Sequence, residues 1–338
     1  MSQRPKIAVL VSSQMKKDCI ADEDFQRLKN FSEVVFGESS SVTYELMLKL
    51  MKDADGCLTG WGTPQFDKQI LGVAPQLKII AHAAGTIKPM LEKVREEIKR
   101  RKIVVTNATT SLGIGVAEFT LGMMLMTMKR AWWFKELTKE GKWQEKEERK
   151  KSCDPYNATI GIIGASKVGR HLIKLLKQFD LKKILVFDPY LSKEDASKLG
   201  VEKTSLEELM SSSDVISLHA PSTQETKWMI NKNNLKLMKD GAIFINTARG
   251  AIVNEKDLIE ELKTGRITAC IDVTDTEPPS LDNPLRTLPN VVLTPHIAGG
   301  IAQNRLRVGK HAIDEIERFF NKEKILYQVN LDIWDQLA

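Results

Sequence analysis

The chain has 338 residues, 42% apolar and 28% charged, which is enough to bury the cores of two ordinary globular domains. Its net charge of +6 is modest, and its densest charged block, at 135–151, alternates lysine with glutamate, which argues against the one-sign patch of a nucleic-acid-binding protein. The four cysteines are scattered, with no C-x-x-C pair and no nearby histidine cluster, which argues against a metal site and favours a reduced, cytoplasmic chain.

The N-terminal residues lead directly into KIAVLV at 6–11, a run too short for a secretory or membrane segment. No stretch contains the roughly 18 apolar residues that a membrane-spanning helix requires. The sequence therefore predicts no membrane partner.

Short apolar runs typical of strands alternate with helical patterns in the first third of the chain. Strands are expected at 6–11, 56–60, 78–83 and 103–107, and helices at 44–54 and 91–101. The strands are almost continuously apolar, as in a sheet that helices cover on both faces. This alternation indicates βαβ units and a parallel sheet.

A long helix with a wide apolar face is expected at about 115–139. Its methionines are typical of core packing. The aromatic end of this helix, Trp132-Trp133-Phe134, looks exposed and could meet a second subunit, because aromatic residues are enriched at interfaces.

A second series of strands and helices follows the long helix. Strands are expected at 159–164, 183–188, 214–220, 241–248, 268–273 and 290–296, and an amphipathic helix at about 303–321. We therefore predict two α/β domains, the first at 1–108 and the second at 109–302. The C-terminal helix and tail, 303–338, are expected to return to the first domain.

The segment TIGIIGASKVGRHLIKLL joins a predicted strand to a predicted helix through the spacing Gly164-x-Ser166-x-x-Gly169. In such a turn the first glycine permits the tight bend, the last allows close helix packing, and the helix N-terminus offers N–H groups to a pyrophosphate. The turn alone could serve packing only. Asp188, at the end of the next strand, could accept hydrogen bonds from ribose hydroxyls and would repel a 2′-phosphate, so the two features together predict NAD(H) rather than NADP(H).

Three later segments place functional side chains at the C-terminal ends of predicted strands, where ligands of open α/β sheets bind. They present Arg249, then Asp272 with Glu277, then His296. Each alone has a structural interpretation: Arg249 as a surface residue, Glu277 as a turn residue, His296 as a strand cap. Together, a guanidinium, a carboxylate and an imidazole are the groups that interconversion of a 2-keto acid and a 2-hydroxy acid requires.

These segments resemble the D-isomer-specific 2-hydroxyacid dehydrogenase family, which includes phosphoglycerate, D-lactate, glyoxylate/hydroxypyruvate and formate dehydrogenases. The matching segments TIGIIGASKVGR, LHAPSTQETKWMIN, FINTARGAIVNEKDLIEEL, CIDVTDTEPPSLDNPL and NVVLTPHIAGG cover most of 159–300 in order. The resemblance implies two Rossmann-like or flavodoxin-like α/β domains with parallel sheets and an interdomain active-site cleft. It assigns NAD(H) binding to 109–302 and substrate binding to 1–108 with 303–338.

The same resemblance implies an oxidoreductase that interconverts a small 2-keto acid and a D-2-hydroxy acid, assembled as a homodimer. His296 would act as acid and base, Glu277 would fix its tautomer and favour the imidazolium form, and Arg249 would bind the substrate carboxylate and carbonyl. The implied cofactor contacts are Gly164, Ser166, Lys167, Val168, Gly169, Asp188, His219, Ala220, Pro221, Thr226, Thr247, Ala248, Asp272 and Gly299, with Asp272 on the nicotinamide carboxamide. The implied substrate-binding loop consists of Ala84, Gly85 and Thr86.

Three departures from the family pattern leave the substrate open: Ser166 at the middle glycine position, GTIKPM at the substrate loop, and NATTSLGIGVAE before the long helix. His82, close to the substrate loop, could point into the pocket or be a buried structural residue. Two alternative functions remain at this point. One is a non-catalytic NAD(H)-sensing corepressor on the same scaffold, against which the intact Arg249, Glu277 and His296 argue. The other is a related dehydrogenase of the formate or phosphite type.

Overall fold

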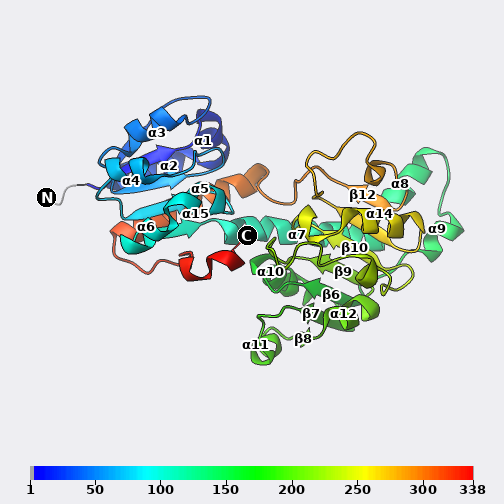
Figure 1. Cartoon of the computed structure of the whole chain (residues 1–338). Helices are drawn as coiled ribbons and strands as arrows, with labels where there is room; N and C mark the ends of the chain where they lie inside the picture. The colour runs from blue at the N-terminus through cyan, green and yellow to red at the C-terminus, as the bar shows by residue number, and fades with distance from the viewer. Residues whose placement is uncertain (1–3, 338) are drawn as a thin grey trace. The chain divides into compact units, whose positions relative to one another are not determined.

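The computed structural model describes residues 4–337, and the chain divides into two compact units (Figure 1). Unit 1 extends to Leu112 and resumes at Gly300, and unit 2 runs from Gly113 to Gly299. Each unit has its own parallel sheet and its own apolar core, so the predicted fold class of two parallel-sheet α/β domains is confirmed.

Unit 1 contains a parallel sheet in the order β2-β1-β3-β4-β5, which is the flavodoxin-like order. The strands are β1 Lys6–Leu10, β2 Glu33–Phe36, β3 Gly56–Thr59, β4 Ile79–His82 and β5 Val104–Asn107. The helices are α1 Ser13–Cys19, α2 Asp22–Phe31, α3 Tyr44–Met51, α4 Lys68–Val73, α5 Lys88–Leu91, η1 Glu92–Val94, α6 Arg95–Arg100, α15 Ala302–Phe320 and η4 Leu331–Gln336. Strand β2 was not expected from the sequence because its four residues are only partly buried.

Alternate residues of β1 enter the two apolar clusters that cover the two faces of this sheet. Ala8 and Leu10 belong to the cluster under α3 and α4, whereas Ile7 and Val9 belong to the cluster under α1, α2 and α15. This is the two-residue period of a strand whose side chains point to opposite faces. Because both faces are buried, β1 reads as a continuous apolar run rather than an alternating one.

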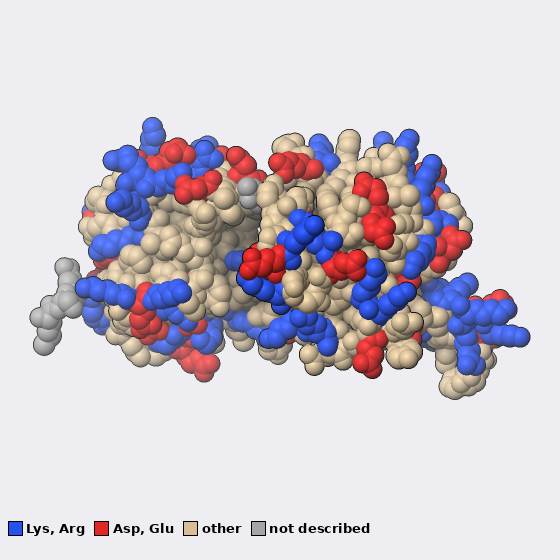
Figure 2. Space-filling model, turned by 90° about the horizontal axis from the view of Figure 1, so that it is seen from below, with Lys and Arg blue, Asp and Glu red and all other residues tan. Residues whose placement is uncertain are grey.

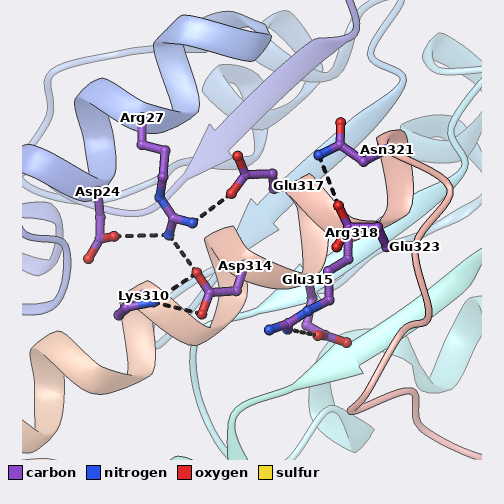
Figure 3. Close-up of polar contacts among 9 residues, drawn as sticks. All are labelled: Asp24, Arg27, Lys310, Asp314, Glu315, Glu317, Arg318, Asn321 and Glu323. Carbon is purple, nitrogen blue, oxygen red and sulfur yellow. Dashed lines mark hydrogen bonds and ion pairs between the residues drawn. The ribbon is translucent and has the colours of Figure 1, made fainter.

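Within unit 1, ion pairs join the C-terminal helix α15 to α2 (Figure 3). Arg27 of α2 lies between the carboxylates of Asp24, Asp314 and Glu317, at N···O distances of 2.9, 2.5 and 2.6 Å. Glu315, fully buried on the same helix, accepts hydrogen bonds from the backbone N–H groups of residues 326 and 327, both at 3.0 Å. These contacts fasten the helix to α2 and the tail to the helix.

Unit 2 contains a parallel sheet in the order β12-β11-β10-β9-β6-β7-β8 (Figure 1). The strands are β6 Thr159–Ile163, β7 Lys183–Phe187, β8 Glu202–Lys203, β9 Val215–Leu218, β10 Ile243–Asn246, β11 Thr268–Ile271 and β12 Val291–Leu293. The helices are α7 Thr109–Met128, which begins in unit 1, then α8 Ala131–Lys139, α9 Lys146–Lys150, α10 Lys167–Leu176, α11 Lys193–Lys198, α12 Leu206–Ser212, α13 Lys232–Leu235, η2 Gly250–Ile252, α14 Glu255–Lys263 and η3 Pro284–Arg286. Counted from β6, the strands follow the 3-2-1-4-5-6 order of dinucleotide-binding sheets, with β12 added at one edge.

The helix expected at about 115–139 is two helices. It starts earlier, at Thr109, and α7 ends at Met128, because Arg130 adopts a left-handed conformation with φ of 55° before α8 begins. By length and composition alone α7 could cross a membrane, although no membrane-spanning helix was expected from the sequence. Its residues Met123, Met124 and Met128 nevertheless lie in an apolar cluster of unit 2, as core helices of globular proteins do.

Trp132 and Trp133, expected to be exposed, are half-buried against unit 2. The indole N–H of Trp133 donates to the carbonyl of Pro289 at 2.6 Å, and the guanidinium of Arg130 stacks over its ring at 3.5 Å. The indole N–H of Trp132 donates to the hydroxyl of Thr127 at 3.3 Å. Trp143 is the exposed tryptophan of this region, with 75% of its surface accessible.

The charged block at 135–151 forms α9 and part of α8 and carries short-range ion pairs. Lys139 pairs with Glu136 at 3.3 Å, and Lys150 pairs with Glu147 at 2.7 Å. Lysine and arginine are interspersed with aspartate and glutamate on the face of each unit seen in Figure 2. The mixed signs are typical of a solvated surface.

Candidate active site

The glycine turn of unit 2 connects β6 to α10 and is shaped by close backbone contacts. Gly164 has a φ of +95°, and a Cβ there would lie 2.7 Å from the backbone nitrogen of Ala220. A Cβ on Gly169 would lie 2.1 Å from the carbonyl oxygen of Gly164. Ser166, at φ −62° and ψ −179°, has a conformation open to any residue, and its hydroxyl caps α10 by accepting from the N–H of Gly169 at 3.3 Å. Serine therefore replaces the middle glycine without backbone strain.

The first turn of α10, with Lys167 and Val168, is where a pyrophosphate would meet helical N–H groups. Burial lowers the pKa of the Lys167 amine. A side chain of the helix stabilises the turn, since Arg170 Nε donates to the carbonyl of Ala165 at 2.9 Å. A tight glycine bend that leads into a helix N-terminus fits a dinucleotide.

Asp188 follows β7 and is fixed by two backbone hydrogen bonds. Its Oδ2 accepts from the N–H of Ala165 and its Oδ1 from the N–H of Tyr190, both at 2.8 Å. Each carboxylate oxygen keeps a further lone pair, so the group can still accept ribose hydroxyls. The phenol of Tyr190 also donates to Glu225 Oε2 at 2.9 Å, and this bridge from β7 to the segment after β9 was not expected from the sequence.

The segment after β9 presents His219, Ala220, Pro221 and Thr226 beside the glycine turn. His219 is buried, with its Nε2 2.8 Å from the hydroxyl of Ser217, and burial lowers its pKa to about 3. The hydroxyl of Thr226 donates to the carbonyl of Pro221 at 2.6 Å and so closes this loop on itself.

Arg249 follows β10 and is exposed, with a backbone braced from below by Asn246. The side chain of Asn246 donates to the carbonyl of Arg249 at 3.2 Å and accepts from the N–H of Ala248 at 3.0 Å. The guanidinium of Arg249 donates only to the carbonyl of Ala248, at 2.6 Å, and most of its five donors stay available to an anion. Thr247 is turned inward, 2.9 Å from the hydroxyl of Thr120 on α7.

His296 follows β12 and pairs with Glu277, which follows β11. The distance between His296 Nδ1 and Glu277 Oε2 is 2.6 Å. Because a carboxylate only accepts hydrogen bonds, Nδ1 is assigned the proton and Nε2 remains for a reacting group. His296 has a φ of +54°, and the second carboxylate oxygen, Oε1 of Glu277, accepts from the N–H of Thr274 at 3.3 Å.

Asp272, expected to hold the nicotinamide carboxamide, also shapes the segment that carries His296. Its Oδ1 accepts from the hydroxyl of Thr294 at 2.6 Å and from the N–H of Ile297 at 2.9 Å, and its Oδ2 accepts from the N–H of Ala298 at 2.9 Å. The side chain is buried, so these bonds satisfy most of its acceptor capacity. Gly299 follows directly and ends unit 2.

The substrate-binding loop predicted from the sequence, 84–86, follows β4 in unit 1. Its first carbonyl, that of Ala84, accepts from the N–H of Ala108 at 2.9 Å. His82 is buried at the end of β4, 2.9 Å from the hydroxyl of Thr59, and burial lowers its pKa to about 4. Of the two interpretations of His82, the structure favours the buried structural histidine.

The structure therefore brings Arg249, Glu277 and His296 to the carboxyl edge of the unit 2 sheet, at the ends of β10, β11 and β12. Within residues 4–337, no group of three or more His, Cys, Asp or Glu side chains is placed to hold a metal ion. Glu255, whose role no motif in the sequence indicates, contacts the segment that carries Glu277.

Comparison with known proteins shows the family to which the sequence is similar. Residues 121–298 match the model of the D-isomer specific 2-hydroxyacid dehydrogenase, NAD binding domain. The chain is 33% identical over 328 residues to a D-3-phosphoglycerate dehydrogenase of Methanocaldococcus jannaschii, covering 96% of this chain and 60% of that one. It is 33% identical to a hydroxypyruvate reductase of Thermotoga maritima, covering 88% of this chain and 95% of that one.

A solved structure of a phosphoglycerate oxidoreductase from Rhizobium etli superposes with a TM-score of 0.82 at 23% identity, covering 97% of this chain and 99% of that one, a likeness of fold. The chain spans only 60% and 49% of the length of two matching phosphoglycerate dehydrogenases, those of M. jannaschii and Archaeoglobus fulgidus.

Proposed function

Because this chain belongs to the D-isomer specific 2-hydroxyacid dehydrogenase family and carries its NAD-binding domain, we propose that it interconverts a 2-keto acid and a D-2-hydroxy acid with NAD(H). The observation that carries the proposal is the 2.6 Å contact between His296 Nδ1 and Glu277 Oε2. His296 follows β12 and Glu277 follows the adjacent strand β11. Arg249 follows β10, the next strand of the same sheet.

In the proposed reduction, His296 donates a proton from Nε2 to the keto oxygen, and Glu277 stabilises the imidazolium form that donates it. Arg249 binds the substrate carboxylate and polarises the carbonyl with its forked donors. The nicotinamide supplies the hydride when bound. The cofactor contacts proposed are those given above, with Asp188 on the ribose hydroxyls.

We further propose that the unit 1 loop Ala84, Gly85 and Thr86 binds the substrate carboxylate through backbone N–H groups. Backbone N–H groups donate hydrogen bonds to a carboxylate without bringing a charge of their own. Replacing Gly85 by proline removes one of these donors and should raise KM for the keto acid more than KM for NADH.

A panel of 2-keto acids tests the function. NADH absorbance is followed with glyoxylate, pyruvate, hydroxypyruvate, phenylpyruvate and branched keto acids, each also with Arg249→Lys as a comparison. Turnover of at least one acid, with a higher KM in the variant because a single ammonium cannot form the forked contact, is expected. Tight NADH binding without turnover of any acid would contradict the proposal.

We also propose a homodimer, in keeping with the family. The exposed Trp143 near α8 and α9 is an aromatic group available for an interface. Light scattering of the purified chain checks this directly, and a mass near the 38.1 kDa of one chain would refute it.

A further inference from the structure

Glu277 lies on an irregular segment, 272–283, and its side chain is 38% exposed. Neither a helix nor a strand fixes it, yet its distance to His296 is as short as a charge-assisted hydrogen bond allows. Something outside the pair must hold the segment in place.

Glu255 makes two hydrogen bonds to that segment. Its Oε2 accepts from the backbone N–H of Asp275 at 3.0 Å, and its Oε1 accepts from the side-chain amide of Asn283 at 2.8 Å. One contact lies on each side of Glu277 in the chain, so one carboxylate holds the segment both before and after Glu277.

Glu255 is itself rigidly placed. It is the first residue of α14, whose N-terminus is capped by the side chain of Asn254 through the N–H of Asp257 at 3.4 Å. Just before this helix, Gly250 approaches the same segment so closely that a Cβ would lie 2.0 Å from the carbonyl carbon of Thr274. The segment that carries Arg249 and the segment that carries Glu277 are thus packed on one another.

We infer that Glu255 is a positioning residue for the acid–base pair, acting through the 272–283 segment to hold Glu277 against His296. This rests on the proposed function for its kinetic readout. The competing explanation is that Glu255 only stabilises the fold. If Glu255 positions Glu277, its effect on kcat requires Glu277; if it only stabilises the fold, its effect does not.

The test compares Glu255→Ala and Glu255→Gln with Lys256→Ala, an exposed neighbour on the same helix. Glu255→Ala is expected to lower kcat for keto-acid reduction about tenfold, the scale of a small misplacement of a catalytic group, with KM for NADH unchanged. Glu255→Gln keeps one acceptor and should recover part of the loss, whereas Lys256→Ala should match the wild type. If Glu255→Ala does not fold, Glu255→Gln carries the comparison alone.

A double-mutant cycle separates positioning from stability. In a Glu277→Gln background, Glu255→Ala should cause no further loss of kcat, because the group through which it acts is already gone. If the loss of kcat in the double variant equals the product of the losses in the two single variants, the inference is overturned. An unchanged kcat in folded Glu255→Ala would overturn it too.

Nitrogen-15 NMR of selectively labelled histidine gives a readout that needs no turnover. The hydrogen-bonded Nδ1 proton of His296 should weaken or shift in Glu255→Ala and stay in place in Lys256→Ala. An unmoved signal in Glu255→Ala would overturn the inference even if kcat fell. A wild-type chain that reduces no keto acid would refute the proposed function, while this NMR comparison would still decide the role of Glu255.

Discussion

At the scale of single residues, the ring of His296 has one nitrogen committed to Glu277, at 2.6 Å, and one left for proton exchange. Replacing His296 by glutamine keeps a polar side chain that cannot take up or release a proton. We expect kcat for keto-acid reduction to fall by about 10²–10⁴-fold, the usual contribution of acid–base catalysis. NADH affinity, measured by fluorescence titration, should not change. A rate equal to that of the wild type would remove His296 from the mechanism.

The glycine turn offers a matched pair of substitutions. Gly164→Ala puts a Cβ 2.7 Å from the backbone of Ala220 at a φ of +95°, so the turn must distort and NADH binding should weaken by tenfold or more, about 1.4 kcal/mol. Ser166→Gly removes only a helix cap and should cost a few tenths of a kcal/mol of stability, with NADH affinity kept. Calorimetric titration measures the NADH affinity of both variants. Equal NADH affinities in the two would contradict the proposed role of the Gly164 backbone.

Residue spacing predicted which side chains end the strands, including Gly164, Asp188, Arg249 and His296, because motif positions follow the strands directly. It did not predict what holds them. The inward hydrogen bonds of Asp272 and the contacts of Glu255 depend on which segments the sheet brings together, and those segments lie 20 or more residues apart in the chain. No local pattern in the sequence records such a pairing.

At the scale of elements, α15 is held to α2 by one guanidinium among three carboxylates (Figure 3). Arg27→Ala leaves Asp24, which is buried, without its cation. Because the side chain of Arg27 is 33% exposed, solvent screens these pairs, and we expect a loss of about 1–3 kcal/mol in the free energy of unfolding, less than a fully buried pair would cost. Lys310→Ala, which removes an exposed partner of Asp314, should cost under about 1 kcal/mol. Urea unfolding measures the free energy of unfolding of both variants. Equal losses would show that Arg27 stabilises the protein no more than an exposed ion pair does.

Strands were predicted best where helices cover both faces of the sheet. The continuous apolar runs of β1, β3, β6 and β9 follow from sheets covered on both faces, whereas β2 and the two-residue β8 have exposed or half-buried residues and left no such signature. The break between α7 and α8 depends on the left-handed backbone of Arg130, a conformation that residues other than glycine seldom adopt. Arginine alone gives no sign of it.

At the scale of the whole molecule, each unit contains a buried histidine whose pKa is lowered by burial, His82 in unit 1 and His219 in unit 2. Burial lowers their pKa values to about 4 and about 3, below the value of about 6.5 expected in the unfolded chain. Between pH 6.5 and these values the unfolded chain binds protons that the folded chain does not, so stability falls as pH falls through this window. Above pH 6.5 neither state is protonated at these sites and the contribution is complete.

Variants that cannot titrate test this linkage one unit at a time. His82→Gln and His219→Gln lose some stability at pH 7 through altered packing, but each should lose less between pH 7 and pH 5 than the wild type does, because one source of proton uptake by the unfolded chain has gone. Urea unfolding at the two pH values, followed by tryptophan fluorescence, gives the difference. Wild-type and variant stabilities that fall in parallel would show that neither histidine is kept neutral by burial.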